Sequence, residues 1–130
     1  MSDRQPTVRL SRMDGHNALW LTYDHEVKSE DVRAAMADLN SILDRLEKPI
    51  HVIVDLRSDP NVPLGAAVDG VLSGPLRHAM MGKWILIGSN WRIDMISTAV
   101  RKVQPDPNSH WCDTEEEAMA ILQGLESSES

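Results

Sequence analysis

The apolar run at residues 50–56 (Ile-His-Val-Ile-Val-Asp-Leu) constrains the fold more than any other segment. It is short, rich in β-branched residues and nearly continuous in its apolar character, which is typical of a strand covered on both faces. A second short run, Trp84–Ile87, ends at Gly88. Because residues 64–80 between the two runs carry apolar side chains at helical spacing, we predict parallel strands joined by a right-handed helical crossover.

A pair of strands and a helix are predicted before the central run. Residues 7–13 and 19–23 alternate in polarity on either side of Asp14-Gly15, a pair that tolerates positive φ. This pattern predicts a β-hairpin. Ser29 then stands before acidic residues and an apolar stripe at helical spacing, which predicts a helix with Ser29 as its N-cap.

Three further elements are predicted after the second run. They are a helix over residues 93–103, a short strand at 110–112 and a last helix behind a capping box made by Thr114 and Glu117. The element order is therefore β-β-α-β-α-β-α-β-α. We expect an α/β fold with a mixed, mostly parallel β-sheet and about four helices.

Length, charge and cysteine usage narrow the classes of function. A chain of 130 residues fits one domain, which we place at 7–125 with flexible ends at 1–6 and 126–130. A net charge of −7 argues against binding to nucleic acid or to an anionic membrane. The single cysteine, Cys112, cannot form an intramolecular disulfide, and no apolar run is long enough for a signal sequence or a membrane span. We therefore expect a soluble, cytoplasmic protein in which Cys112 is a small buried hydrophobe.

Several segments, taken in order, resemble the STAS/SpoIIAA-like superfamily, most closely its divergent branch of small bacterial single-domain proteins. The resemblance covers residues 7–125. It rests on the strand pair ending near Tyr23, the helix start Ser29-Glu30-Asp31, the strand end Val54-Asp55-Leu56-Arg57, the strand Trp84-Ile85-Leu86-Ile87-Gly88, and Asp113-Thr114-Glu115-Glu116-Glu117-Ala118 with Leu122.

This resemblance implies a compact domain without catalytic machinery that works by docking onto partner proteins. In the anti-sigma factor antagonists of the superfamily, a serine at the start of the helix after the central strand is phosphorylated. Counted from Asp55, that position falls near Leu64-Gly65, and neither residue can accept a phosphate. We therefore expect a regulatory module without this phosphoserine switch, and the sequence leaves open whether Ser58 is phosphorylated.

The loops at the carboxyl ends of the predicted parallel strands form the candidate binding surface. Asp55 ends the central strand, where we expect its carboxylate to accept hydrogen bonds from backbone amides of the next loop. Ser58 is expected to be a turn serine that bonds the backbone of its own loop, with a phosphoacceptor or ligand contact as the alternative. The candidate binding residues are Asp55, Arg57, Ser58, Asn61, Ser89, Asn90, Trp91 and Arg92. An exposed Trp91 would support this surface, and a buried one would make it a core residue.

The sequence gives little support for a metal, a cofactor or an enzyme. His25 stands between acidic residues, but neighbouring residues of a strand point to opposite faces and cannot converge on one ion. His110 and Cys112 supply only two ligands, too few for a zinc site. The glycines match neither a phosphate loop nor a dinucleotide fingerprint, and no nucleophile–base–orienter set can be assembled.

Two hypotheses for function remain after these exclusions. The first is a regulatory module that binds a protein partner through the candidate surface. The second is a small-molecule or lipid-binding domain whose apolar pocket is lined by the Met- and Leu-rich residues 64–81. A homodimer is compatible with either hypothesis, and the sequence does not decide the oligomeric state.

Overall fold

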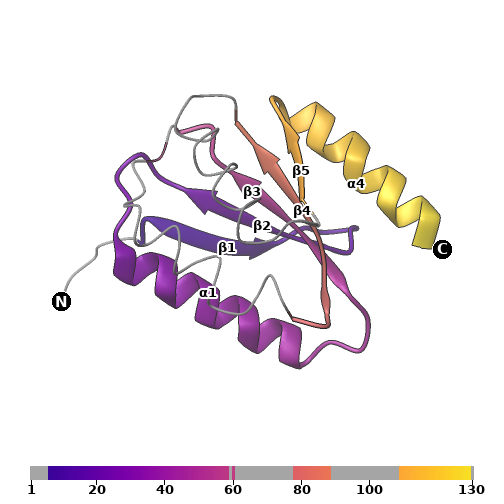
Figure 1. Cartoon of the computed structure of the whole chain (residues 1–130), viewed down its shortest axis with the longest axis horizontal. Helices are drawn as coiled ribbons and strands as arrows, with labels where there is room; N and C mark the ends of the chain where they lie inside the picture. Colours follow the sequence, from indigo (N-terminus) through magenta and orange to yellow (C-terminus); the bar gives the residue numbers. More distant parts are fainter. Residues whose placement is uncertain (1–5, 59, 61–77, 89–108, 130) are drawn as a thin grey trace.

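The computed structural model describes residues 6–58, 60, 78–88 and 109–129 (Figure 1). These residues form one five-stranded sheet in the order β1-β2-β3-β4-β5. β1 pairs with β2 antiparallel, as the predicted hairpin requires, whereas β2–β3, β3–β4 and β4–β5 are parallel pairs. The sheet is therefore mixed. Its strands are β1 (Val8–Arg12), β2 (Ala18–Tyr23), β3 (Ile50–Asp55), β4 (Met81–Ile87) and β5 (Ser109–Cys112).

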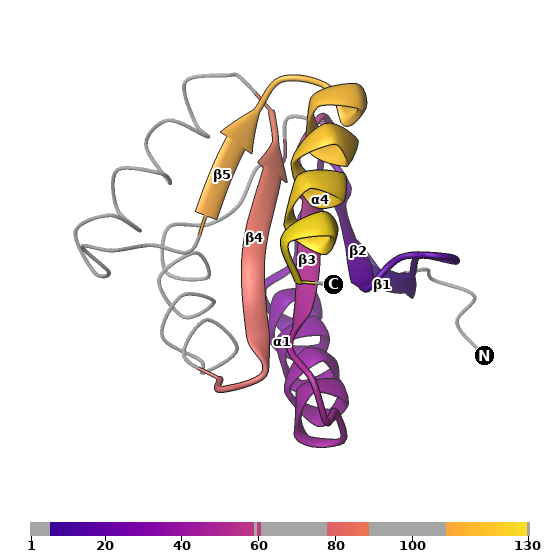
Figure 2. The same ribbon diagram turned by 90° about the vertical axis from the view of Figure 1, so that its right-hand side faces the viewer.

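Helices α1 (Ser29–Asp44) and α4 (Glu115–Glu129) pack on opposite faces of the sheet (Figure 2). Leu39 of α1 lies in one buried cluster, and Ala118 and Leu122 of α4 lie in the other. β3 contributes to both clusters, because Val52 faces the first and Ile53 faces the second. The continuous apolar character of the central run is explained by this double coverage.

The helix pattern agrees with the prediction in part. The helix expected at 93–103 lies outside the described residues, and so does the helix expected at 64–80 as far as residue 77, whereas residues 78–80 are not helical and form a turn before β4. α4 continues to Glu129, so it includes most of the tail that the sequence analysis treats as a flexible end. Thr114 caps this helix as expected, since its Oγ1 accepts a hydrogen bond from the backbone N–H of Glu117 at 3.1 Å.

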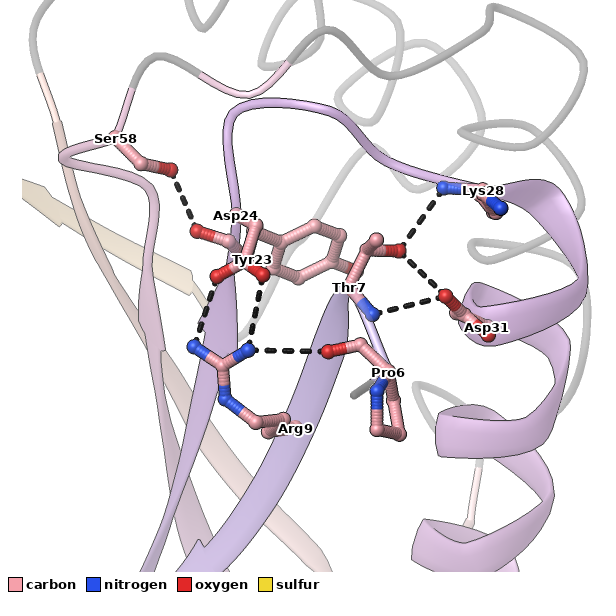
Figure 3. Close-up of polar contacts among 8 residues, drawn as sticks. All are labelled: Pro6, Thr7, Arg9, Tyr23, Asp24, Lys28, Asp31 and Ser58. Carbon is pink, nitrogen blue, oxygen red and sulfur yellow. Dashed lines mark hydrogen bonds and ion pairs between the residues drawn. The ribbon is translucent and has the colours of Figure 1, made fainter. Parts of the chain in front are cut away.

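The predicted N-cap of α1 is wrong. Ser29 is the first helical residue, and Lys28 occupies the cap position without a side-chain cap bond. Thr7, the residue before β1, instead holds the helix start in place through tertiary hydrogen bonds (Figure 3). Its Oγ1 accepts a hydrogen bond from Lys28 N–H at 3.0 Å, and its N–H and O–H both donate to the buried carboxylate of Asp31. A tertiary contact therefore fixes the helix start, and local sequence cannot show it.

The phenol of Tyr23 provides a test of core packing at the end of β2. Burial disfavours the charged phenolate and raises the pKa of Tyr23 to about 12. Because the folded pKa lies above the unfolded value near 10, this group stabilises the fold fully below pH 10 and loses its contribution as the pH rises toward 12. Tyr23 is the only tyrosine of the chain, so near-ultraviolet absorbance follows its ionisation directly. We expect titration about two pH units later in the native protein than in concentrated urea, and equal midpoints would contradict the burial.

Candidate functional site

The carboxyl ends of β2, β3, β4 and β5 lie at one edge of the sheet because these strands are parallel. Asp55 ends β3 here, and Cys112 ends β5. α4 begins directly after β5, and α1 begins beside the start of β1, which pairs with the end of β2 (Figure 1). This edge therefore gathers strand ends and helix starts, the arrangement in which α/β domains commonly bind ligands or partners.

Asp55 and Arg57 form a fixed ion pair at this edge. Asp55 Oδ1 accepts hydrogen bonds from the backbone N–H of Arg57 at 3.1 Å and from its Nε at 3.0 Å, and Arg57 Nη2 donates to Oδ2 at 2.8 Å. The expected bond between Asp55 and a backbone amide of the next loop is confirmed. Partial burial of Asp55 opposes its ionisation, but the hydrogen bonds and charge of Arg57 outweigh burial and lower the pKa of Asp55.

The guanidinium of Arg57 is held by two further groups. Its Nη2 lies 3.5 Å from Oε1 of Glu115 in the first turn of α4, and its Cζ lies 6.0 Å from the ring centroid of Trp20 in β2. The latter distance is within the range of a cation–π contact. Nevertheless, the Arg57 side chain remains 45% exposed. We refer to Trp20, Asp55, Arg57 and Glu115 as the Arg57 surface.

Ser58 binds the backbone of a neighbouring strand and not that of its own loop, which corrects the sequence-based expectation. Its Oγ donates a hydrogen bond to the carbonyl oxygen of Tyr23 at 2.5 Å (Figure 3). The carbonyl of Ser58 in turn lies 3.3 Å from Nδ1 of His25. Ser58 therefore joins the loop after β3 to the end of β2. Ser58 is nevertheless exposed to solvent.

A second ion pair lies beside this link. Arg9 of β1 binds both carboxylate oxygens of Asp24, at 2.9 and 2.8 Å, and also donates to the carbonyl of Pro6 (Figure 3). The hydrogen bond from Arg9 is the main reason that the pKa of Asp24 is lowered. Both side chains are about 40% exposed, so solvent screening limits the contribution of the pair to stability.

The other predicted site residues lie outside the described part of the chain. These are Asn61, Ser89, Asn90, Trp91 and Arg92. The structure therefore brings Asp55 and Arg57 together and places Ser58 next to them, but the exposure test proposed for Trp91 stays open. Trp20 and Glu115 are not among the binding residues predicted from the sequence. Alternation along β2 shows which face of the strand Trp20 occupies, but only the pairing of β2 with β3 places that ring beside Arg57.

The side chains at this edge offer few reactive groups. Burial, followed by the charges of Glu117 and Asp113, raises the pKa of the Cys112 thiol, which keeps it protonated. Cys112 is buried, as predicted. His25 is exposed, and its Nε2 lies 4.0 Å from Glu26. Within the described ranges, no three His, Cys, Asp or Glu side chains are placed to hold a metal ion.

The chain was compared with family models, curated proteins and solved structures. No family model matches the sequence, and no curated protein matches it. The structure is similar to the crystal structure of an uncharacterised protein of the DUF3478 family with a SpoIIAA-like fold, from Shewanella loihica PV-4. The TM-score is 0.66, and the match covers 94% of this chain and 98% of that chain at 17% sequence identity. This chain has a SpoIIAA-like fold.

The SpoIIAA-like fold agrees with the resemblance drawn from the sequence. At 17% identity the likeness concerns the fold alone and assigns no activity. No helix in the described part of the chain is both long and apolar enough to cross a membrane.

Proposed function

We propose that this SpoIIAA-like protein is a non-enzymatic, cytoplasmic regulatory module that binds a partner protein through the Arg57 surface. The observation that carries the proposal is the fixed geometry of an exposed guanidinium. Asp55 and Glu115 orient Arg57, and Trp20 lies beneath it. Because the side chain is ordered before binding, little rotamer entropy remains to be lost when a partner docks.

The residue types of the Arg57 surface suit a protein interface. Arginine and tryptophan are enriched among the residues that dominate binding energy in such interfaces. Two further exposed carboxylates belong to the adjoining segments of the chain, Glu26 after β2 and Glu116 next to Glu115. A partner with a basic segment and an acceptor group for Arg57 would complement this chemistry.

The proposed module works without a phosphoserine switch. The sequence position that corresponds to the phosphorylated serine of the antagonists carries Leu64-Gly65. The nearest described hydroxyl, Ser58, is already used as a donor to the backbone of Tyr23. Phosphorylation there would remove the donor that joins the loop after β3 to the end of β2.

Replacing Arg57 with alanine is expected to reduce partner binding at least tenfold while the fold survives, because the ion pairs of Arg57 are at the surface. Affinity capture from native lysate with wild type, followed by a titration with the captured protein, measures the change. Arg45→Ala removes an exposed arginine at the end of α1 and should bind as wild type does. Equal affinity for wild type and Arg57→Ala, with both melting normally, would contradict the proposed surface.

A second candidate function, binding of a small apolar molecule, is supported by Trp84. Its indole N–H is buried and has no hydrogen-bond partner in the described part of the chain. Trp84 lies on β4 in the α1-side cluster, where Leu86 and Trp111 are only partly buried. An unsatisfied buried donor costs about 1–3 kcal/mol, so a ligand with an acceptor atom and an apolar body would gain from meeting it.

If this second function is correct, binding of the ligand depends on the indole N–H of Trp84. Native mass spectrometry of the purified protein should then show a bound mass that survives in Trp111→Phe and is lost in Trp84→Phe. Thermal-shift assays with medium-chain fatty acids as probes should show the same difference. A clean unliganded mass, together with no thermal shift for wild type, would rule this candidate out.

A further inference from the structure

The face of the sheet that carries α4 is only partly covered by that helix. α4 packs mainly on β4 and β5, and Figure 2 shows β1 and β2 to one side of it. Trp20 of β2 contacts the α4-side cluster, and Ser11 of β1 lies directly opposite Trp20 in the strand pairing, so both side chains share this face. Ser11 is exposed, and Trp20 and Thr22 are half-buried. Neither described helix therefore covers this face at Ser11.

One flank of α4 borders this part of the sheet. Glu115 contacts Arg57, whose guanidinium lies over the Trp20 ring. Glu126, near the other end of α4, accepts a hydrogen bond from the backbone N–H of the residue before β2. Met119 is half-buried and stands four residues after Glu115 and seven before Glu126, so it shares their side of the helix. We refer to Ser11, Trp20, Thr22 and Met119 as the Ser11 face.

The Ser11 face has the width and the chemistry for one further helix. Neighbouring strands lie about 4.8 Å apart and a helix with its side chains is about 10 Å wide, so β1 and β2 together match one helix. Trp20 and Met119 offer apolar contact, which the apolar stripe of an amphipathic helix requires. Addition of a strand at β1 is less suitable, because Val8 is only 3% exposed and the margin of β1 is therefore not open.

The charge at the carboxyl edge of the sheet selects the kind of helix. Residues 24–31, 55–57 and 113–117 lie at the carboxyl ends of β2, β3 and β5. They contain nine Asp and Glu against two Arg and Lys, a net charge of −7 that equals the net charge of the whole chain. The Ser11 face reaches this edge at Thr22, the last residue but one of β2. A second copy of this chain brings the same negative charge and is repelled, whereas a basic segment is attracted.

We propose that the partner of the Arg57 surface presents a basic amphipathic helix, which lies on the Ser11 face alongside α4. Its apolar stripe contacts Trp20 and Met119, and its basic residues lie against the acidic carboxyl edge. The inference rests on the proposed function and deepens it, because it names the kind of partner segment that binds next to Arg57.

A designed peptide tests this chemistry on the full chain. The probe is an amphipathic helix of about four turns, built from leucine and lysine, which is titrated into the isotope-labelled protein. We expect the amide resonances of Ser11, Thr22 and Met119 and the indole N–H resonance of Trp20 to shift, and the affinity to fall as salt is added. The same leucines combined with glutamate should not bind. No binding of the leucine–lysine peptide, or shifts confined to other residues, overturns the proposal.

A scrambled peptide distinguishes an amphipathic helix from simple attraction between charges. It contains the same leucines and lysines in an order without an apolar stripe, and it should bind at least tenfold more weakly. Equal affinity for the two peptides would mean that the acidic edge attracts any basic chain, and the helical partner would then be wrong.

Ser11→Arg tests the Ser11 face with the partner itself. The long cationic side chain occupies the face and repels a basic helix, so it should weaken binding of the leucine–lysine peptide, and of the protein captured with wild type, at least tenfold. The fold should survive, because Ser11 is exposed and its Oγ makes one long contact, 3.5 Å to the carbonyl of Trp20. Ser41→Arg makes the same change at an exposed residue of α1, on the other side of the sheet, and should bind as wild type does.

The variants at Ser11 and Arg57 separate this inference from the proposed function. If Arg57→Ala weakens partner binding and a folded Ser11→Arg does not, the partner uses the Arg57 surface but not the Ser11 face, and the inference alone is overturned. If neither variant changes the affinity, both the proposed function and the inference are overturned. Cross-linking of the captured partner identifies its contact segment, and an acidic or extended segment there would also overturn the inference.

Discussion

Replacing Gly82 with alanine is expected to lower the free energy of unfolding by about 3 kcal/mol, since a methyl group has no space at this point of β4. A Cβ on Gly82 would lie 2.5 Å from Nδ1 of His51 and 2.9 Å from the carbonyl oxygen of Ile50. His51 is 3% exposed, and its Nδ1 accepts a hydrogen bond from Lys83 N–H at 2.9 Å. The ring cannot move away without breaking that bond, and the carbonyl belongs to the neighbouring strand.

This arrangement makes His51 a packing residue between β3 and β4. The strand pairing shifts its register between Ile50 and Val52, so the bulge and the glycine together make room for the imidazole ring. The Lys83 bond requires Nδ1 to be an acceptor, which places the proton of the neutral ring on Nε2. Gly82→Ala is expected to damage both the ring position and the bulge.

Gly124→Ala is the matched control for this prediction. Gly124 lies in α4, and a Cβ there would meet nothing within 4 Å. The same substitution is therefore expected to stabilise the protein by about 0.5–1 kcal/mol, because alanine loses less backbone entropy than glycine in a helix. Urea unfolding of both variants measures the difference. A Gly82→Ala variant as stable as wild type would mean that β3 and β4 do not approach this closely.

Local sequence patterns predicted a structural feature correctly where the residues that cause it lie within one short segment of the chain. The Asp14-Gly15 turn was predictable because few residues other than glycine favour positive φ, and Gly15 has a φ of 79°. The burial of β3 on both faces was predictable from its unbroken apolar run. Thr114 was predictable as a cap because its partner Glu117 is only three residues away.

Contacts between distant segments were not predictable in this way. Thr7 stands 24 residues before Asp31, whereas the local pattern pointed to Ser29 as the cap of the helix. The Arg57 surface combines residues of β2, the β3 end and α4, which become neighbours only when the strand order is known. Ser58 shows the same limit, since its acceptor belongs to another strand. The sequence therefore located Asp55 and Arg57 but not their surroundings.

Leu122→Ala is expected to lower the free energy of unfolding by about 3–4 kcal/mol, the range for a leucine removed from a core that cannot fully collapse. Leu122 is fully buried, and with Ala118 it forms the part of α4 that enters the cluster containing Ile53 and Ile85. Among the described elements, α4 is the one helix that packs on this face, so no other described helix can move in to fill the cavity.

Gln123→Ala provides the control, because Gln123 is the next residue of α4 and is exposed. It should change the free energy of unfolding by less than about 0.5 kcal/mol.

The variants also distinguish a loss of stability from a loss of partner binding at the Arg57 surface. If Leu122→Ala loosens α4, the contact between Arg57 and Glu115 should weaken while the bonds between Arg57 and Asp55 persist, because the latter join residues only two positions apart in the chain. Partner affinity would then fall less in Leu122→Ala than in Arg57→Ala. A cost below about 1 kcal/mol for Leu122→Ala would contradict the packing of α4 on the sheet.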